Sequence, residues 1–407
     1  MAFKKIASRS PSPDTPDLLF RDLPRRKLPD VLPHQKEIME LYASHAENES
    51  DVALQLPTGS GKTLVGLLIA EWRRRKNKEK IVYLCPTRQL VYQTVNQAEK
   101  IYGLSVVGFT GQNKDYSASD KTKYKQADNV SITTYSSIFN TNSFFSDADV
   151  IILDDAHAAE NYVATLWTLR IYRNKNDVLY NLVIKILHRR IDHTSYTRII
   201  RGANSEPDFS WVDKIPTPTL LEVHDGLLDI LDEHTTTNNE LFYPWKMLRD
   251  NLKSCHLYVS CSEITIRPII TPTWDLPAFE KPKQRIYMSA TLGEGGDLER
   301  LMGRKHIFRL PTATGSDHQG VGRRFFMFPE LSLDNEKQQQ LRLSLLREAS
   351  RSLILTPSEG IKNNISEHIN NKSSLTVFDI TEIEKSKEDF VNSDNSVVVA
   401  CPFGKAA

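Results

Sequence analysis

The chain has 407 residues, enough for two to three domains with cores of their own. Its 52 lysines and arginines nearly balance 51 aspartates and glutamates, so a nucleic-acid partner would need local basic faces instead of a global positive field. Four scattered cysteines exclude a disulfide framework, and without a signal core or an apolar run of roughly 20 residues we expect a cytoplasmic protein with no membrane role.

The beginning of the chain, residues 1–24, is rich in Pro, Ser and charged side chains. Such a composition buries too little apolar surface to fold alone, so we expect a flexible tail. From 25 to 160, helical patterns alternate with short apolar runs, which is typical of a doubly wound parallel α/β domain. The pattern predicts a helix at 34–45 and strands near Ala53 and at 81–85, 130–133 and 150–153.

The middle of the chain, from 161 to 280, has a different texture and predicts a mainly helical insertion. Residues 281–312 contain a strand-like run at 285–288 and return to the first α/β domain. Residues 313–407 predict a partial second α/β domain. We expect insertion helices at 163–172, 178–190, 220–231 and 241–252, strand-like alternation at 256–270, and second-domain strands at 325–328, 353–356, 375–378 and 397–400.

The most informative stretch reads Leu-Pro-Thr-Gly-Ser-Gly-Lys-Thr, residues 56–63, and joins a strand to a helix. Its glycines let backbone N–H groups point inward as an anion nest, a lysine reaches the β- and γ-phosphates, and a threonine hydroxyl can ligate Mg²⁺. Leu56 departs from the general pattern, which has Gly there. The candidate nucleotide-binding residues are Thr58, Gly59, Ser60, Gly61, Lys62 and Thr63.

A second acidic motif follows the apolar run 150–153, which reads as a strand buried on both faces. Carboxylates at the carboxyl end of such a strand lie beside the nucleotide crevice of an α/β sheet. Asp154 is placed to hold Mg²⁺ and Asp155 to orient the attacking water. The alternative is a loop of solvated acids that caps a helix.

Six short motifs follow one another along the chain, namely Pro57–Thr63, Pro86–Arg88, Thr110–Gly111, Thr133–Ser136, Asp154–His157 and Ser289–Thr291. Their order and spacing resemble the first motor domain of the superfamily 2 DEAD/DEAH-box helicases. The resemblance covers about residues 32–158 and 283–292. It implies a RecA-like P-loop fold and a helicase that hydrolyses ATP with Mg²⁺ and moves on DNA, with RNA as the alternative. The family usually has Glu where this chain has Asp155, one methylene shorter.

The resemblance also implies roles for single residues. Gln35 would read the adenine edge, against the alternative of a plain helix-start glutamine. Lys62, Asp154, Asp155 and His157 would be catalytic, and Ser289 and Thr291 would couple the nucleotide to the nucleic acid through contacts such as His157. The implied nucleic-acid contacts are Thr87, Arg88, Gly111, Thr134 and Ser136, with Thr356 and Ser358 in the second domain. Ser or Thr at a strand-to-helix turn is more often a plain N-cap.

The gap between the acidic motif and Ser289 is about 134 residues (289 − 155), where compact relatives have a short connection. A large insertion here is similar to the arch of the XPD/DinG-like DNA helicases. Those relatives carry a four-cysteine iron–sulfur cluster, but Cys85 is alone between the phosphate loop and the acidic motif, so we expect no cluster. Basic insertion residues could line a strand channel or form a solvated face, namely Lys185, His188, Arg189, Arg190, Arg198 and Arg201.

Motors of this family complete the site with arginines from the far end of the second domain, and the sequence stops just after the run 397–400. This motivates a rival function, an ATP-binding nucleic-acid clamp or subunit with little turnover, which a protein partner would complete. Arg323 and Arg324 are candidate replacements, although 319–323 only mimics the arginine motif. A phosphotransferase would leave the helicase-like motifs unexplained. The basic run 73–78 is interpreted as a solvated helix end.

Overall fold

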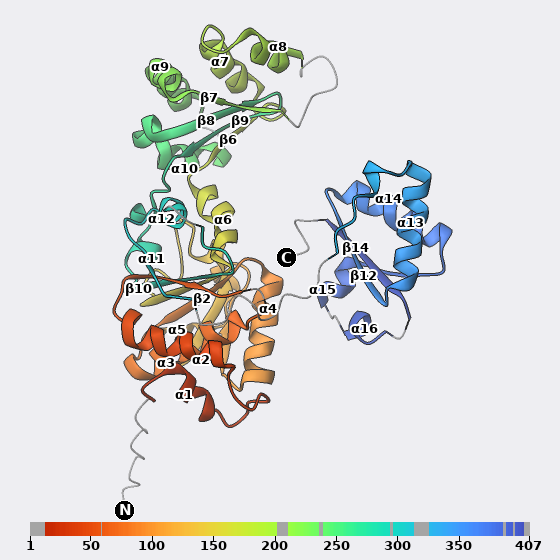
Figure 1. Ribbon diagram of the computed structural model, residues 1–407. Coiled ribbons are helices and arrows are strands. Elements are labelled where there is room, and N and C mark those ends of the chain that lie inside the picture. The colour runs from red at the N-terminus through yellow and green to blue at the C-terminus, as the bar shows by residue number, and fades with distance from the viewer. Residues whose placement is uncertain are drawn as a thin grey trace, which may run out of the picture. The chain divides into compact units, whose positions relative to one another are not determined.

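The computed structural model describes residues 13–57, 59–201, 211–235, 239–293, 296–312, 325–385, 388–393 and 395–402. The chain forms two compact units, one reaching to residue 320 and the other beginning at residue 321 (Figure 1). Thr58 and the arginines Arg323 and Arg324 lie outside the described residues. None of the described helices combines the length and apolar character needed to cross a bilayer.

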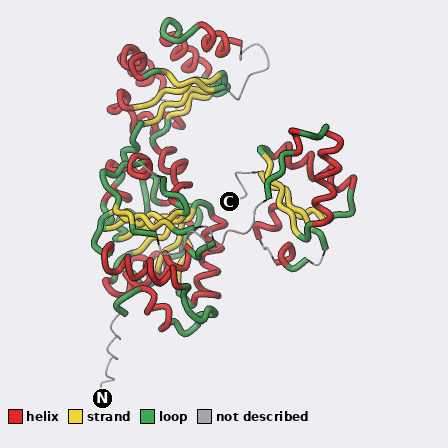
Figure 2. Tube along the Cα trace, viewed as in Figure 1, coloured by secondary structure: helices red, strands yellow, loops and turns green. Residues whose placement is uncertain are grey.

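The first unit is built on a parallel sheet with the strand order β11-β1-β10-β5-β2-β4-β3. Nearly every residue of its central strands is buried, as expected for a parallel sheet covered on both faces (Figure 2). The mixed α/β fold with a large parallel sheet confirms the predicted fold class. The strands are β1 Asp51–Gln55, β2 Ile81–Cys85, β3 Val106–Gly108, β4 Val130–Thr134, β5 Val150–Asp154, β10 Gln284–Ser289 and β11 Phe308–Arg309.

Helices cover both faces of this sheet, because alternate strand residues point into two different cores. Val52 and Leu54 pack in one core with α1 to α4, whereas Ala53 packs in the other with α6, α11 and α12. Gly66 allows α3 to lie close to β10, since a Cβ there would lie 2.5 Å from Met288 Cε. The helices are α1 Pro16–Arg21, α2 Pro33–Leu41, α3 Lys62–Asn77, α4 Arg88–Gln97, α5 Ala118–Lys125, α6 Ala159–Leu166, α11 Pro277–Glu280 and α12 Asp297–Met302.

The predicted flexible tail is wrong for its later part, because Pro16–Arg21 forms α1. Leu19 and Phe20 are fully buried in the core that α3 also lines. The Trp72 indole Nε1 donates a hydrogen bond to the Pro13 carbonyl oxygen at 2.7 Å. Composition favoured a tail, but two adjacent large apolar side chains outweigh it once a neighbouring helix covers them.

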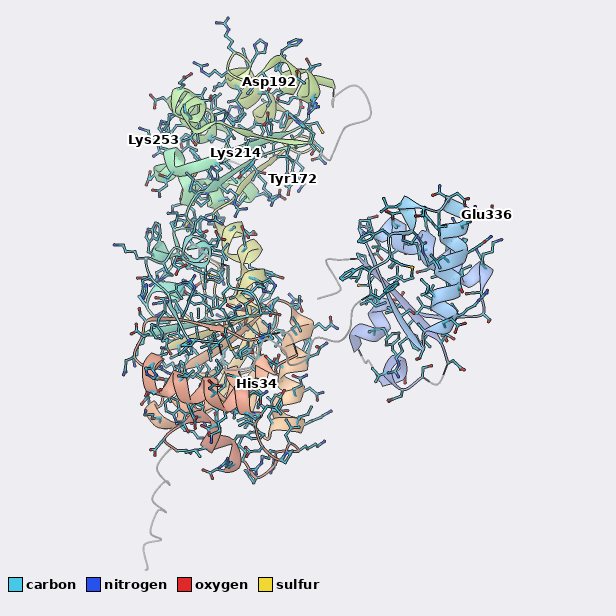
Figure 3. The ribbon with its side chains drawn as sticks, in the orientation of Figure 1. His34, Tyr172, Asp192, Lys214, Lys253 and Glu336 are labelled. Atoms are coloured by element: carbon cyan, nitrogen blue, oxygen red, sulfur yellow. The ribbon has the colours of Figure 1, made fainter. Side chains whose placement is uncertain are left out.

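The insertion contains an antiparallel sheet with the order β6-β9-β8-β7, as well as helices. The prediction of a mainly helical insertion is therefore incomplete, because only the run 256–270 was expected to form strands. The predicted helix at 163–172 is wrong in its second half, where α6 gives way to β6 with alternating buried and exposed side chains. Figure 3 marks Tyr172 at the end of β6 and Lys214 on β7. The elements are β6 Leu169–Tyr172, α7 Asp177–Leu187, α8 His193–Arg201, β7 Val212–Ile215, α9 Thr217–Thr235, α10 Asn239–Leu248, β8 Cys255–Ser260 and β9 Glu263–Pro268.

A single hydrophobic core runs from one face of the parallel sheet into the insertion. Val163 and Trp167, on and just after α6, are buried in this core together with Leu169 and Ile171 of β6. The insertion therefore packs against the parallel-sheet part of the first unit through apolar contact. The exact boundaries between the two stay a prediction.

The second unit has a parallel sheet with the order β12-β14-β13. The predicted strand at 325–328 is wrong, since these residues form no strand and Phe325 is 85% exposed. An apolar run becomes a strand only when a neighbouring edge pairs with it, and such pairing is not visible in local sequence. The elements are α13 Asn335–Glu348, β12 Arg351–Thr356, α14 Glu359–Lys372, β13 Thr376–Phe378, α15 Ile380–Lys385, α16 Glu388–Val391 and β14 Val397–Pro402.

The basic run at the end of α3 is only partly the solvated face that the sequence predicted. Arg73 is buried, and its Nε and Nη2 donate to the Glu79 carboxylate at 2.8 and 2.9 Å. Its Nη1 donates to the Tyr42 hydroxyl oxygen at 2.9 Å and to Gln284 Oε1 at 2.7 Å. The Arg73 side chain therefore links α3 to β10 through buried hydrogen bonds and is not available to nucleic acid.

Replacing Arg73 by leucine should destabilise the first unit strongly, because Glu79 would keep a buried charge without its partner. We expect a loss of about 3–5 kcal/mol in the free energy of unfolding, measured by urea titration. Arg75→Leu is the matched control, since Arg75 is 40% exposed and its partner Glu71 keeps Arg74. It should cost about 1 kcal/mol or less. Equal losses in the two variants would contradict the buried role of Arg73.

Candidate nucleotide site and nucleic-acid edge

The strand order brings the predicted motifs to one edge of the parallel sheet. The neighbouring strands β1, β10 and β5 end at this edge. Strand β1 ends just before the phosphate loop, β10 ends at Ser289 and β5 ends at Asp154. The next strands, β2, β4 and β3, lead to Thr87, Thr134 and Gly111. In open α/β sheets, ligands bind in the crevice outside these carboxyl ends. Two sets of candidate residues therefore lie on two halves of one edge.

The phosphate loop has the backbone that an anion nest requires. Gly59 and Gly61 adopt the left-handed conformation, with φ angles of 83° and 80°. Helix α3 begins directly afterwards at Lys62, so the N–H groups of its first turn are directed toward the loop. The loop is anchored by its flanks, since Leu56 N donates to the Ser289 carbonyl oxygen at 2.9 Å.

Gln35, at the start of α2, lies against the phosphate loop. Its Nε2 donates to the Ser60 carbonyl oxygen at 2.8 Å, and its Oε1 accepts from Leu32 N at 2.9 Å. The imidazole Nε2 of His34 lies 3.0 Å from the same Ser60 oxygen. A Cβ on Gly61 would overlap the Gln35 amide, so only glycine fits there. Gln35 thus contacts the candidate site, while its recognition of adenine stays a prediction.

The phosphate loop and the acidic motif meet through a direct ion pair. The Lys62 ammonium donates to Asp155 Oδ1. Asp155 adopts the left-handed conformation, with φ 51° and ψ 55°, which is uncommon for a residue with a Cβ. Aspartate tolerates this conformation better than most residues, and backbone strain of this kind is concentrated at functional sites.

Asp154 is held by two tyrosines that the sequence analysis did not single out. The Tyr83 hydroxyl donates to Asp154 Oδ2 at 2.8 Å, and the Tyr135 hydroxyl donates to the Asp154 carbonyl oxygen at 2.6 Å. Burial raises the pKa of the Asp154 carboxyl to about 6, although the bond from Tyr83 opposes the shift. The Tyr83 hydroxyl also lies within reach of the Thr63 hydroxyl. One signal in the sequence pointed to Tyr83. It is a tyrosine with a polar hydroxyl in an otherwise apolar run, and that run forms the strand next to the one that ends in Asp154.

The residues expected to couple nucleotide and nucleic acid are in contact. The His157 Nδ1 and the Ser289 hydroxyl oxygen are 2.6 Å apart, and Thr291 N donates to the same oxygen at 3.3 Å. The contact is possible because β10 pairs directly with β5. Ser289 therefore touches the phosphate-loop flank through its carbonyl and the acidic motif through its hydroxyl.

The expected nucleic-acid residues lie at the other half of the edge, and several have local roles. The Thr87 hydroxyl accepts from Leu90 N at 3.2 Å and so caps α4, and the Thr134 and Ser136 hydroxyl oxygens are 3.0 Å apart. Arg88, Gly111 and Ser136 are exposed. In the second unit, Thr356 is buried and Ser358 caps α14. The plain N-cap alternative thus describes the hydroxyls of Thr87 and Ser358.

The basic residues of the insertion are partly occupied by contacts within the chain. The ring of His188 packs on Tyr196 at 4.2 Å, and Arg190 donates to Glu222 at 3.2 Å. Arg198 lies over the Trp211 ring. Lys185 and Arg189 are exposed, and the side chain of Arg201 lies outside the described part. These contacts favour a solvated face over a channel lining.

Comparison with known families identifies one part of the chain. Residues 32–174 match the family model of the DEAD/DEAH box helicases. This stretch, about a third of the chain, is similar to a DEAD/DEAH box helicase domain. It contains the phosphate loop, Gln35 and the acidic motif, whereas Ser289 and Thr291 of β10 and its following turn lie beyond the match. No curated protein matches the sequence.

Solved structures of helicases show weak similarity to the chain that contains this stretch. A structure titled XPD_APO has 17% identity and a TM-score of 0.48, over 92% of this chain and 79% of that one. S. tokodaii Xpd4 has 16% identity and a TM-score of 0.46, over 90% and 80%. The helicase MrfA bound to DNA and AMPPNP has 13% identity and a TM-score of 0.47, over 96% of this chain and 44% of that one. Values this low transfer neither activity nor substrate to this chain.

The cysteines and acidic side chains in the described part of the chain do not gather into a metal centre. Cys85, Cys255, Cys261 and Cys401 are buried, and none of these four forms a disulfide. Within the described ranges, no cluster of three or more His, Cys, Asp or Glu side chains is arranged to hold a metal ion. A metal at the phosphate loop would therefore need ligands from the nucleotide as well as from the protein.

The raised pKa of Asp154 predicts a gain in stability on removing its charge. The folded protein holds a proton on Asp154 more tightly than the unfolded chain, so the stabilising contribution of this carboxyl is lost as the pH rises through about 6. Asp154→Asn removes the buried charge and keeps an oxygen that can accept from Tyr83. In chelator and without nucleotide, unfolding at about pH 7.5 should cost about 1–2 kcal/mol more than in the parent.

The pH dependence and a surface variant provide the controls for this experiment. The difference should shrink toward zero as the pH falls to about 4, because both side chains are then neutral. Asp229→Asn, at an exposed position of α9, should change stability little at any pH. A destabilised Asp154→Asn protein at pH 7.5 would show that the charged carboxylate stabilises the fold.

Proposed function

We propose that the chain is a motor that hydrolyses ATP with Mg²⁺ and moves along single-stranded DNA. The observation that carries the proposal is the contact between Lys62 of the phosphate loop and Asp155 of the acidic motif. Two motifs more than 90 residues apart thus meet where the loop would receive the terminal phosphates. The helicase family of residues 32–174 supports the same general class of activity.

The donors around the phosphate loop suit ATP and Mg²⁺. The Thr63 hydroxyl and the Asp154 carboxylate are hard oxygen ligands of the kind that Mg²⁺ prefers, and burial of Asp154 leaves it in need of a cation. When bound, the ion would supply positive charge that offsets the negative charge of the phosphates. Lys62 would exchange its contact with Asp155 for the phosphates, which frees Asp155 to orient a water molecule.

The nucleic acid is proposed to follow the half-edge formed by the ends of β2, β4 and β3. Exposed Arg88, Gly111 and Ser136 offer a cation, a backbone N–H and a hydroxyl, which are the groups that bind phosphate and sugar. DNA is preferred to RNA because the large insertion resembles that of the XPD/DinG-like DNA helicases. Binding of single-stranded RNA with equal or greater affinity would reverse this preference.

Asp155 favours one rival function, an ATP-binding nucleic-acid clamp with little turnover. Its side chain is one methylene shorter than the usual glutamate, and its carboxylate accepts a hydrogen bond from the Lys62 ammonium. A clamp would bind ATP and DNA tightly without DNA-stimulated hydrolysis. Steady-state hydrolysis with and without single-stranded DNA separates the two functions.

Replacing Lys62 by alanine should lower ATP turnover by roughly a hundredfold or more, because the cation that faces the transferring phosphoryl group is lost. The fold should persist, since Lys62 lies at a helix start and fills no core volume. The measurement is phosphate release with saturating single-stranded DNA. Lys36→Ala is the control, because Lys36 forms only a surface pair with Glu40 at 3.6 Å. Unchanged turnover in Lys62→Ala would refute the site.

Asp155→Glu tests whether the short acidic side chain limits hydrolysis. If water positioning is limiting, the added methylene should raise turnover by about two- to tenfold. Nucleotide affinity, measured separately with a non-hydrolysable analogue, should change little. A turnover equal to or below that of the parent would show that the site is adapted to aspartate and would favour the clamp.

A further inference from the structure

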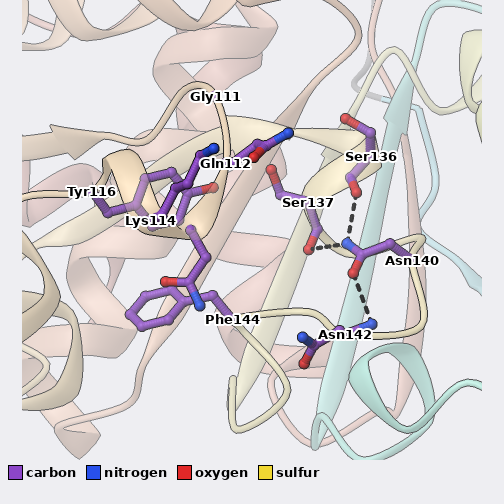
Figure 4. A pocket seen from close by; sticks show the side chains of 10 residues that line it. Gly111, Gln112, Lys114, Tyr116, Ser136, Ser137, Asn140, Asn142 and Phe144 are labelled. Atoms are coloured by element: carbon purple, nitrogen blue, oxygen red, sulfur yellow. Dashed lines mark hydrogen bonds between the residues drawn. The ribbon is translucent and has the colours of Figure 1, made fainter.

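A polar pocket of about 400 Å³ lies at the nucleic-acid half of the sheet edge (Figure 4). One wall is the turn after β3, where Gly111 has a φ of 90° and leads to Lys114. The other wall is the segment after β4, from Ser136 to Asn142. Its volume lies in the range of small-ligand sites, roughly 300–1,000 Å³. The proposed function assigns Gly111 and Ser136 to backbone contacts and leaves the pocket between them unexplained.

The floor of the pocket is aromatic and rigid. Tyr116 and Phe144 line it, with ring centroids 5.6 Å apart and nearly perpendicular planes. Both rings pack on Phe109, at 5.0 and 6.1 Å, and on Phe145, which is fully buried. Such a cluster keeps its shape when a ligand arrives, so little conformational entropy would be lost on binding.

The rim of the pocket offers hydrogen-bonding groups and a positive charge. Asn140 is a structural member, because its Nδ2 donates to the Ser136 and Ser137 carbonyl oxygens at 2.7 and 3.0 Å. Its Oδ1 accepts from Asn142 N at 2.9 Å and so fixes the backbone of Asn142. Within the described ranges, neither the Asn142 carboxamide nor the Lys114 ammonium has a hydrogen-bond or ion-pair partner, and both residues are exposed.

We propose that this pocket binds one unstacked base of the nucleic-acid strand. A carboxamide presents a donor and an acceptor in one plane, which matches the edge of a base, and an aromatic floor suits its flat apolar face. Lys114 would meet the adjoining phosphate. The inference rests on the proposed function, because the strand must first lie along the ends of β3 and β4.

A site for phosphate alone would look different. It would require cations or backbone N–H groups that converge inside the pocket, whereas Lys114 lines it among amides, hydroxyls and aromatic rings. The Lys121 ammonium lies over those rings instead, 6.0 Å from the ring centroid of Tyr116 and 5.9 Å from that of Phe144. The two aromatic residues contribute nothing to phosphate binding, but they provide apolar contact for a base. The residues that line the pocket therefore favour binding of a base over binding of a phosphate.

The test compares Asn142→Ala with the parent on two strands of about 12 nucleotides, one of deoxythymidine and one whose sugars carry no bases. Fluorescence anisotropy reports the affinity for each. We expect Asn142→Ala to bind the thymidine strand about three- to tenfold more weakly and the base-free strand as tightly as the parent does. Lys114→Ala should weaken binding of both strands, because its charge acts on the backbone.

The controls separate a failure of the pocket from a failure of the function. Asn77→Ala, at the opposite end of the sheet on α3, and Lys125→Ala, exposed on α5, should bind both strands like the parent. An unchanged affinity of Asn142→Ala for the thymidine strand, or equal losses on both strands, would overturn the base pocket while leaving the motor intact. If the parent binds neither strand, the proposed function fails and the pocket fails with it.

Discussion

The position of β10 between β1 and β5 is the constraint on which the candidate site depends. This strand is about 130 residues beyond β5 in sequence, yet it separates the strand before the phosphate loop from the strand before the acidic motif. Its last residue, Ser289, accepts a hydrogen bond from Leu56 and contacts His157. Ser289 therefore contacts the flanks of both motifs, in addition to the direct ion pair between Lys62 and Asp155.

The same constraint explains how the insertion can influence the site. Helix α6 begins directly after the short turn Ala156–Ala158, which contains His157. It leads within three residues to β6 of the antiparallel sheet. Arg267 of β9 pairs with Glu160 of α6 at 3.2 Å, and a continuous core extends from α6 into the insertion. Helix α6 thus connects the acidic motif to the insertion both along the chain and through packing.

The sequence predicted those parts of the molecule that local residue patterns encode. Short runs rich in apolar residues identified β1, β2, β4, β5 and β10, since a strand buried on both faces is mainly apolar. The phosphate loop was predictable because glycine and lysine have fixed roles there. The strand at 325–328 failed, and α1 and β6 were missed, because pairing partners and covering helices are non-local. Tyr83 escaped notice for the same reason, since only the register of β2 against β5 brings its hydroxyl to Asp154.

Two groups of the candidate site are held in energetically costly states. The carboxyl of Asp154 is buried with a pKa raised to about 6, and Asp155 occupies a left-handed backbone conformation. Lys62 partly offsets both by contacting Asp155 and placing a positive charge near Asp154. In the proposed function, a cation that arrives with the nucleotide would take over this compensation when Lys62 turns to the phosphates, because two adjacent carboxylates would otherwise remain uncompensated.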